Sequence, residues 1–162
     1  MALSVVFLVV GCTGEQAVNK PTITQDQALA RVEELIKETV GAISPEPRMR
    51  LYPPSLNVNP CLDPTDEGSE KRVVINRSYY LDGIAKDQVL EVAKQVRRYW
   101  EKQGHYIEVA SANGLNVSGR SKPDDFLLSL SPTGPEDDTV LSLGVTSYCV
   151  WPNGTPEPSS GP

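Results

Sequence analysis

Few residues of this chain have side chains suited to covalent or metal chemistry: three cysteines, one histidine and two short acidic runs. General acid–base catalysis needs a partner within hydrogen-bonding reach, and the sequence offers His105 no G-x-S-x-G or similar nucleophile motif. The acidic runs at 63–67 and 136–138 lack the spacing and closing Glu of a calcium loop. Structural zinc needs four closely spaced ligands, which two isolated cysteines and one distant histidine do not supply. We therefore expect a surface histidine, solvated acidic loops, no metal and no cofactor.

The N-terminus carries the most specific motif of the sequence. Residues 2–11 contain no charged side chain, and their apolar run is too short for a bilayer, which takes about 20 apolar residues, but fits an export signal. The run ends in VVGC at 9–12, which resembles a bacterial lipobox. The resemblance implies cleavage before Cys12, a diacylglyceryl group on its thiol and attachment to the outer face of the cell membrane.

Two observations bear on the lipobox interpretation. A leader normally begins with Lys or Arg, so we expect the true start codon to lie upstream of Met1. The alternative interpretation is a buried strand that ends in a structural cysteine. The polar, aperiodic stretch 13–22 that follows favours a lipoprotein linker instead.

The lipobox also accounts for the odd number of cysteines. If Cys12 carries lipid, Cys61 and Cys149 remain to form a disulfide in an oxidising compartment. A metal site is the alternative, and the poor ligand set argues against it. We therefore predict the Cys61–Cys149 bond.

Length and charge narrow the function classes. A chain of 162 residues suits one domain. Its net charge of −6 and the lack of a large Lys/Arg cluster exclude a nucleic-acid partner. Anionic headgroups would also repel such a body, so membrane attachment would depend on the lipid.

The periodicity of apolar residues predicts two helices and five strands. The first helix begins at Thr24 with a capping box to Gln27, and ends near Gly41 and Pro45. The second spans about 87–102. The predicted strands are 47–52, 71–81, 105–110, 125–131 and 139–150.

This order of elements predicts an α+β fold, a two-layer sandwich with an antiparallel sheet of four to five strands and both helices on one face. We assign 1–11 to a signal peptide, 12–22 to the lipidated cysteine and flexible linker, 23–151 to a single domain and 152–162 to a disordered tail.

The large aromatic residues are the remaining candidates for function. Trp100 lies on the apolar stripe of the second helix, which predicts a core position. Tyr79 and Tyr80 point to opposite faces of a strand, so one should be buried and the other wet. Trp151, beside the expected disulfide, either covers that bond or lines a ligand surface. We take Trp151 and Tyr80 as a candidate binding surface.

The ensemble of lipobox, short linker, Cys61, a Tyr-rich strand and a terminal Cys-Val-Trp-Pro resembles the small cell-envelope lipoproteins of actinobacteria, of the LppA-like kind. That resemblance implies a location more than an activity. The leading hypothesis is a non-enzymatic envelope module that binds a protein, peptide or lipid. The alternative is a carrier of a small apolar ligand or lipid between helices and sheet, and a hydrolase is third.

Overall fold

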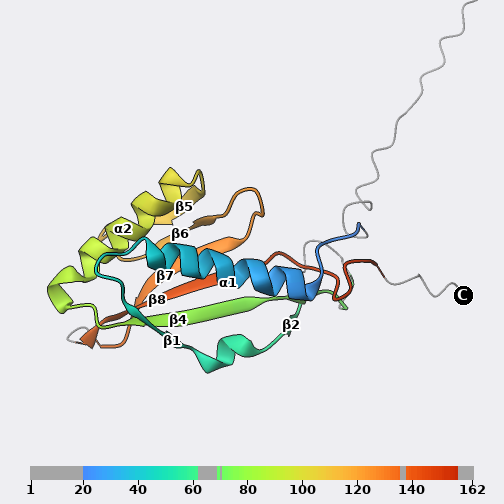
Figure 1. The fold of residues 1–162 in the computed structure, drawn as a ribbon, viewed down its shortest axis with the longest axis horizontal. Helices are drawn as coiled ribbons and strands as arrows, with labels where there is room; N and C mark the ends of the chain where they lie inside the picture. Colours follow the sequence, from blue (N-terminus) through green and yellow to red (C-terminus); the bar gives the residue numbers. More distant parts are fainter. Residues whose placement is uncertain (1–19, 62–68, 70, 136–137, 157–162) are drawn as a thin grey trace, which may run out of the picture.

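The computed structural model describes residues 20–61, 69, 71–135 and 138–156, which form two layers (Figure 1). The helices are α1 (Gln25–Gly41) and α2 (Val89–Lys102), with two short 3-10 helices, η2 (Pro53–Leu56) and η3 (Lys86–Gln88). The strands are β1 (Arg48–Leu51), β2 (Asn59–Pro60), β3 (Val73–Val74), β4 (Asn76–Asp82), β5 (Tyr106–Ala110), β6 (Val117–Arg120), β7 (Leu127–Thr133) and β8 (Val140–Thr146).

The main sheet has six strands in the order β1-β4-β8-β7-β6-β5, and each neighbouring pair is antiparallel. β2 and β3 form a separate two-stranded sheet. Both helices lie on the same face of the main sheet (Figure 1). The α+β prediction is therefore confirmed, while the expected four to five strands are corrected to six.

The strand that the sequence prediction missed in the main sheet is β6. It has four residues with one large apolar side chain, Val117, and a glycine in its interior, so it shows no clear alternation. A Cβ at Gly119 would overlap the backbone oxygen of Tyr106 and lie 3.2 Å from the Cα of Ile107. The close approach of β5 to β6 therefore requires glycine at position 119, and this glycine also interrupts the sequence pattern that would have predicted the strand.

α1 begins where the sequence predicted. Thr24 Oγ1 accepts a hydrogen bond from the Gln27 N–H at 3.2 Å, and Gln27 Oε1 accepts one from the Thr24 N–H at 2.9 Å. This capping box satisfies two N–H groups that the first helical turn leaves without partners. The predicted apolar stripe faces the sheet, with its buried positions at Ala28, Val32, Leu35, Ile36 and Val40.

α2 packs beside α1 over the same layer. It begins at Val89, later than predicted, because η3 occupies the preceding turn. Trp100 is 0% exposed, which confirms its core position. Its indole Nε1–H donates to Thr39 Oγ1 at 3.0 Å and so joins the two helices. Gly104 follows with φ +80°, the left-handed conformation expected just after a helix.

A polar contact links α1 to the sheet at β4. Arg77 Nε lies 3.5 Å from Glu33 Oε1, and the Tyr79 hydroxyl lies 3.0 Å from each carboxylate oxygen of Glu33. Burial, followed by the hydrogen bond to Glu33, raises the pKa of Tyr79. Tyr79 is therefore the member of the Tyr79–Tyr80 pair that faces the helices.

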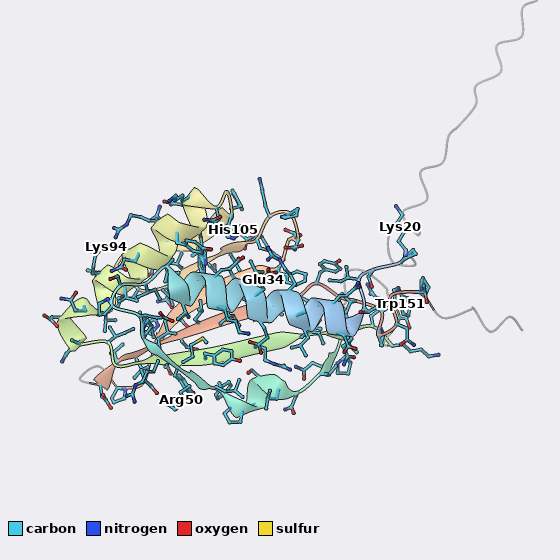
Figure 2. The ribbon with its side chains drawn as sticks, viewed as in Figure 1. Lys20, Glu34, Arg50, Lys94, His105 and Trp151 are labelled. Carbon is cyan, nitrogen blue, oxygen red and sulfur yellow. A yellow bond between two sulfur atoms is a disulfide. The ribbon has the colours of Figure 1, made fainter. Side chains whose placement is uncertain are left out.

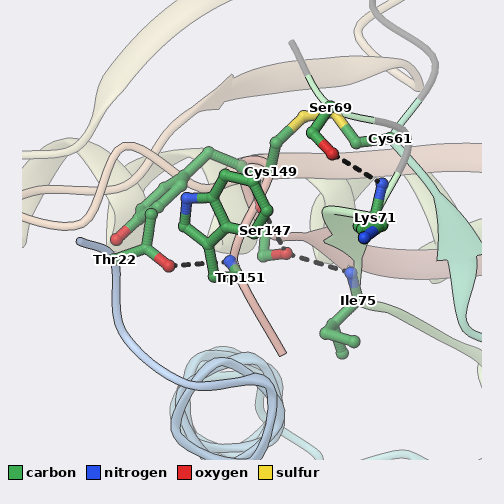
Figure 3. The surroundings of a disulfide bond; sticks show 9 residues. Thr22, Cys61, Ser69, Lys71, Ile75, Ser147, Cys149 and Trp151 are labelled. Atoms are coloured by element: carbon green, nitrogen blue, oxygen red, sulfur yellow. Dashed lines mark hydrogen bonds between the residues drawn. A yellow bond between two sulfur atoms is a disulfide. The ribbon is translucent and has the colours of Figure 1, made fainter. Parts of the chain in front are cut away.

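The predicted disulfide is present between Cys61 and Cys149, whose Cα atoms are 5.7 Å apart (Figure 3). Next to it, Val73 and Val150 exchange two backbone hydrogen bonds of 2.9 Å. The disulfide therefore joins the small β2–β3 sheet to the segment that follows β8. Disulfides of this kind are typical of compartments outside the cytoplasm.

The two ends of the described chain meet near the disulfide. The Thr22 N–H donates to Gly154 O at 2.8 Å, and the Gln25 N–H donates to Pro152 O at 3.1 Å. Residues 152–154, which we assigned to the tail, are thus hydrogen bonded to the start of α1. Neither of the two described helices is long and apolar enough to cross a membrane.

Candidate binding surface

The face of the main sheet opposite the two helices is the candidate functional site, and we call it the open face. Side chains alternate across a strand, so the register of the ladder assigns each residue to a face. The helix-covered face carries the buried leucines of β7 and β8. The open face carries small polar side chains over its centre, namely Ser78, Ser118, Ser129, Ser131, Ser142 and Thr146.

One row across the centre of the open face is especially flat. Ser78, Gly144, Ser129 and Ser118 pair in succession across β4, β8, β7 and β6. A Cβ at Gly144 would lie 2.9 Å from the hydroxyl oxygens of both Ser129 and Ser78. Any larger residue would force the neighbouring hydroxyls aside, so glycine keeps this row low. The serine hydroxyls supply donors and acceptors without bulk.

Larger side chains gather at the margin formed by β1 and β4. The register places Arg50 opposite Tyr80, and the Arg50 guanidinium carbon lies 4.5 Å from the centre of the Tyr80 ring. The Tyr52 ring meets the Tyr80 ring edge to face, with centroids 5.7 Å apart. We call Arg50, Tyr52, Tyr80 and Asp82 the arginine–tyrosine patch. Its cation–π and aromatic contacts have favourable geometry.

Asp82 holds the guanidinium of this patch in place. Arg50 donates from Nε to Asp82 Oδ2 at 2.7 Å and from Nη2 to Oδ1 at 3.1 Å. The hydrogen bond from Arg50 lowers the pKa of Asp82, and the same bond raises the pKa of Arg50. Such bidentate pairing fixes orientation as well as charge, so the patch presents a preformed arginine over a tyrosine ring.

The opposite margin of the open face is formed by β5. Tyr106 is 60% exposed and Val109 is 59% exposed. The ladder is irregular between Ile107 and Val109, and this extra residue keeps Tyr106 and Val109 on the same face, since their partners Arg120 and Ser118 both lie on the open face. The open face therefore has an aromatic residue at each margin.

The structure separates the two residues predicted to form a binding surface. Tyr80 lies on the open face and is partly exposed. Trp151 is 3% exposed and lies at the disulfide end of the domain (Figures 2 and 3). Its backbone N–H donates to Thr22 Oγ1 at 2.8 Å. Trp151 is thus buried, which corrects the expectation that its side chain forms part of an exposed surface.

His105 lies between α2 and β5 and has a structural contact. Its Nδ1 accepts a hydrogen bond from the Lys122 backbone N–H at 3.1 Å, so the proton of the neutral ring is on Nε2. Burial, followed by the positive charge of Arg31, lowers the pKa of His105. This bond fastens the start of β5 to the loop before β7.

A small pocket lies at the end of the sheet remote from the disulfide. It has a volume of about 280 Å³ and lies between the turn after α1, the end of β4 and the start of α2. Its lining combines apolar Pro45, Ile84 and Val92 with charged Arg48 and Asp82. Within the described residues, no group of three His, Cys, Asp or Glu side chains could hold a metal ion.

Arg50 and Tyr52 were not predicted as functional candidates from the sequence. Their signal was the alternation of arginines with Met49 and Leu51, which predicts a strand with one wet face. Nothing in that pattern says which strand becomes the neighbour. The pairing of β1 with β4 brings Arg50 to a tyrosine 30 positions away in the chain.

No protein-family model, curated protein or solved structure matches this chain.

Proposed function

We propose that the protein is a lipid-anchored module of the cell envelope that binds a protein partner through the open face and catalyses no reaction. The observation that carries this proposal is the arginine–tyrosine patch, a preformed stack beside a flat row of serines and glycine. No reaction is needed to explain this arrangement.

The composition of the open face favours a protein as the partner. Tyrosine and arginine, together with tryptophan, are enriched among the residues whose truncation strongly weakens protein–protein binding. Serine and glycine around them give adaptable hydrogen bonding with little bulk, a combination also found in antibody binding loops. Tyr52 and Tyr80 supply the aromatic area, Arg50 supplies the charge, and the serines surround them.

The lipobox supports an anchor on Cys12, at the outer face of the membrane. The first described residue, Lys20, lies at the same end of the domain as Trp151 (Figure 2). Ten residues of extended linker span at most about 35 Å. The disulfide end would therefore face the membrane, and the open face would stand to the side, free to meet another protein. The family proposed for the chain remains the actinobacterial envelope lipoproteins.

A carrier of small apolar ligands is less well supported. Ligand pockets usually enclose about 300–1,000 Å³ and are mostly apolar. The pocket at the end of the sheet has about 280 Å³ and includes Arg48, Asp82 and Glu46 in its lining. The layer between helices and sheet is filled by a continuous apolar core.

Site-specific photo-crosslinking in the producing cells tests the binding proposal. We would replace Ser142, at the centre of the open face, by p-benzoylphenylalanine, and Lys94, on the exposed side of α2, as the matched control. We expect a covalent adduct with one protein from position 142 and none from position 94. An adduct from position 94 alone, or none from position 142, would contradict the proposal.

The anchor has its own test. The variant Cys12→Ala should move from the membrane fraction into the medium, because the two acyl chains that hold the protein can no longer be attached. Retention of this variant on membranes would show that the lipid on Cys12 is not the anchor.

A further inference from the structure

The outer edge of β5 exposes backbone groups that another strand could pair with. β5 is the last strand of the main sheet, and no described strand lies beyond it. Just after β5, the Ser111 N–H donates to Asn116 O at 2.9 Å, and the Asn116 N–H donates to Ser111 Oγ at 3.0 Å, so these two residues occupy the position of a hydrogen-bonded pair at the end of the ladder. Such pairs alternate with non-hydrogen-bonded pairs along an antiparallel ladder. The next pair, Ala110 and Val117, is therefore not hydrogen bonded, and the N–H and C=O of Ala110 point outward.

The side chains at this edge are apolar and exposed. Tyr106 at 60% and Val109 at 59% are the most exposed of the large hydrophobic residues that the structure describes. The one acidic side chain of β5, Glu108, lies 3.2 Å from Arg120 Nε, so its charge is largely balanced within the domain. An edge strand with exposed apolar side chains is suited to pairing with a further strand.

The other edge of the sheet is better protected. β1 has Pro47 before it and Pro53 after it, and it carries Arg48 and Arg50. Prolines and charges are common devices that prevent an edge strand from pairing. β5 has no proline. Its irregularity between Ile107 and Val109 also discourages pairing there, but it lies before Ala110 and leaves the last pair of the strand regular. β5 is thus the more receptive of the two edges.

The size of the open face also favours contact of a partner with the β5 edge. The main sheet has six strands, and its longest strands have seven residues, so the open face covers at most about 24 Å by 23 Å, or roughly 550 Å². A stable protein–protein interface usually covers about 800 Å² on each partner. The open face alone is therefore smaller than the contact area of a stable interface. A partner would reach that area by extending its contacts over one margin of the sheet, and the β5 margin is the apolar one.

We propose that an extended segment of the partner polypeptide pairs with the outer edge of β5 as a seventh strand of the main sheet. This inference rests on the proposed function and names how the partner docks. Backbone hydrogen bonds to Ala110 would hold the segment, and its apolar side chains would pack on Tyr106 and Val109. A polypeptide in extended conformation is the ligand that complements such a strand edge.

Two proline variants test the geometry of the edge on the purified protein. Proline is tolerated on an edge strand where its nitrogen faces solvent. Ala110→Pro should therefore leave the melting temperature within about 2 °C of the wild type. Val109→Pro should lower it much more, because the Val109 N–H points toward β6. Equal losses for the two variants would overturn the assignment of the Ala110 N–H to the outer edge.

Crosslinking tests the docking itself. With p-benzoylphenylalanine in place of Tyr106, we expect an adduct with the same protein that is captured from position 142. The adduct from position 106 should fall at least fivefold in the Ala110→Pro background and persist in Ala110→Ser, which keeps the N–H. An unchanged yield in Ala110→Pro, no adduct from position 106, or an adduct with the mass of two copies of this chain would overturn the proposal. If position 142 still captures a protein, the proposed function stands and only the edge docking fails.

Discussion

Replacing both Cys61 and Cys149 by alanine should lower the free energy of unfolding by about 4–5 kcal/mol. The two residues are 88 positions apart, and a cross-link closing a loop of that length removes about 15 cal/mol/K of entropy from the unfolded chain. At 25 °C this corresponds to about 4.6 kcal/mol. A change of 1 kcal/mol shifts the melting temperature of a domain of this size by about 3–4 °C, so we expect a fall of about 15 °C.

Thermal unfolding followed by circular dichroism measures this effect. The reduced wild-type protein should melt near the double variant, and reductant should leave the double variant unchanged. These controls separate loss of the bond from loss of the sulfur atoms. A double variant that melts within about 3 °C of the oxidised wild type would show that the entropy of loop closure does not dominate the effect of the bond. Two free thiols in the exported protein, measured by intact mass without reductant, would refute the bond itself.

Three further variants test local features of the fold. Burial lowers the pKa of His105, so between that pKa and about 6.5 the unfolded chain binds more protons than the native protein. The contribution of His105 to stability is therefore present above this pH window and is lost as the pH falls through it. His105→Asn should make the melting temperature depend less on pH between about pH 5 and 7, and an unchanged slope would contradict this. Gly119→Ala should lower the free energy of unfolding in urea by more than about 2 kcal/mol, because its Cβ would overlap the backbone of β5. Gly41→Ala is the control and should be nearly neutral, because no atom lies within 4 Å of its Cβ. Similar effects of the two variants would argue against the close approach of β5 to β6. Thr39→Val should cost about 1–3 kcal/mol by leaving the Trp100 N–H buried without an acceptor, while Thr39→Ser should retain most of the stability. A larger loss for Thr39→Ser than for Thr39→Val would assign the role of Thr39 to its methyl group instead.

The helical layer followed closely from the sequence. The capping box at Thr24 and the apolar stripe behind it depend on residues three and four apart, so local spacing determines them. Trp100 was predicted as core for the same reason. The pairing of Cys61 with Cys149 followed from the cysteine count once Cys12 was assigned to the lipid, and the structure contains this bond.

The open face could not be predicted in the same way, because it is formed by contacts between segments distant in the sequence, which local patterns do not encode. β6 was missed because Gly119 interrupts its alternation. The arginine–tyrosine patch requires β1 to lie beside β4, and this neighbourhood depends on the strand order of the whole sheet. Trp151 was expected either to cover the disulfide or to line a ligand surface, and we assigned it to the candidate binding surface, but it is buried, and its backbone N–H donates to Thr22 from the opposite end of the domain sequence. Tyr80 alone of the two predicted surface residues lies on the open face.

Binding of a protein partner should depend on the arginine–tyrosine patch. The most direct measurement is the yield of the adduct from position 142 in a Tyr80→Ser background, compared with Tyr148→Ser, whose ring packs on the core residue Phe126 instead. Loss of a tyrosine on which an interface depends typically costs about 2 kcal/mol or more, about thirtyfold in affinity. We predict at least a tenfold lower yield for Tyr80→Ser and little change for Tyr148→Ser, with both variants folded by circular dichroism. Equal yields in Tyr80→Ser and the wild type would contradict the claim.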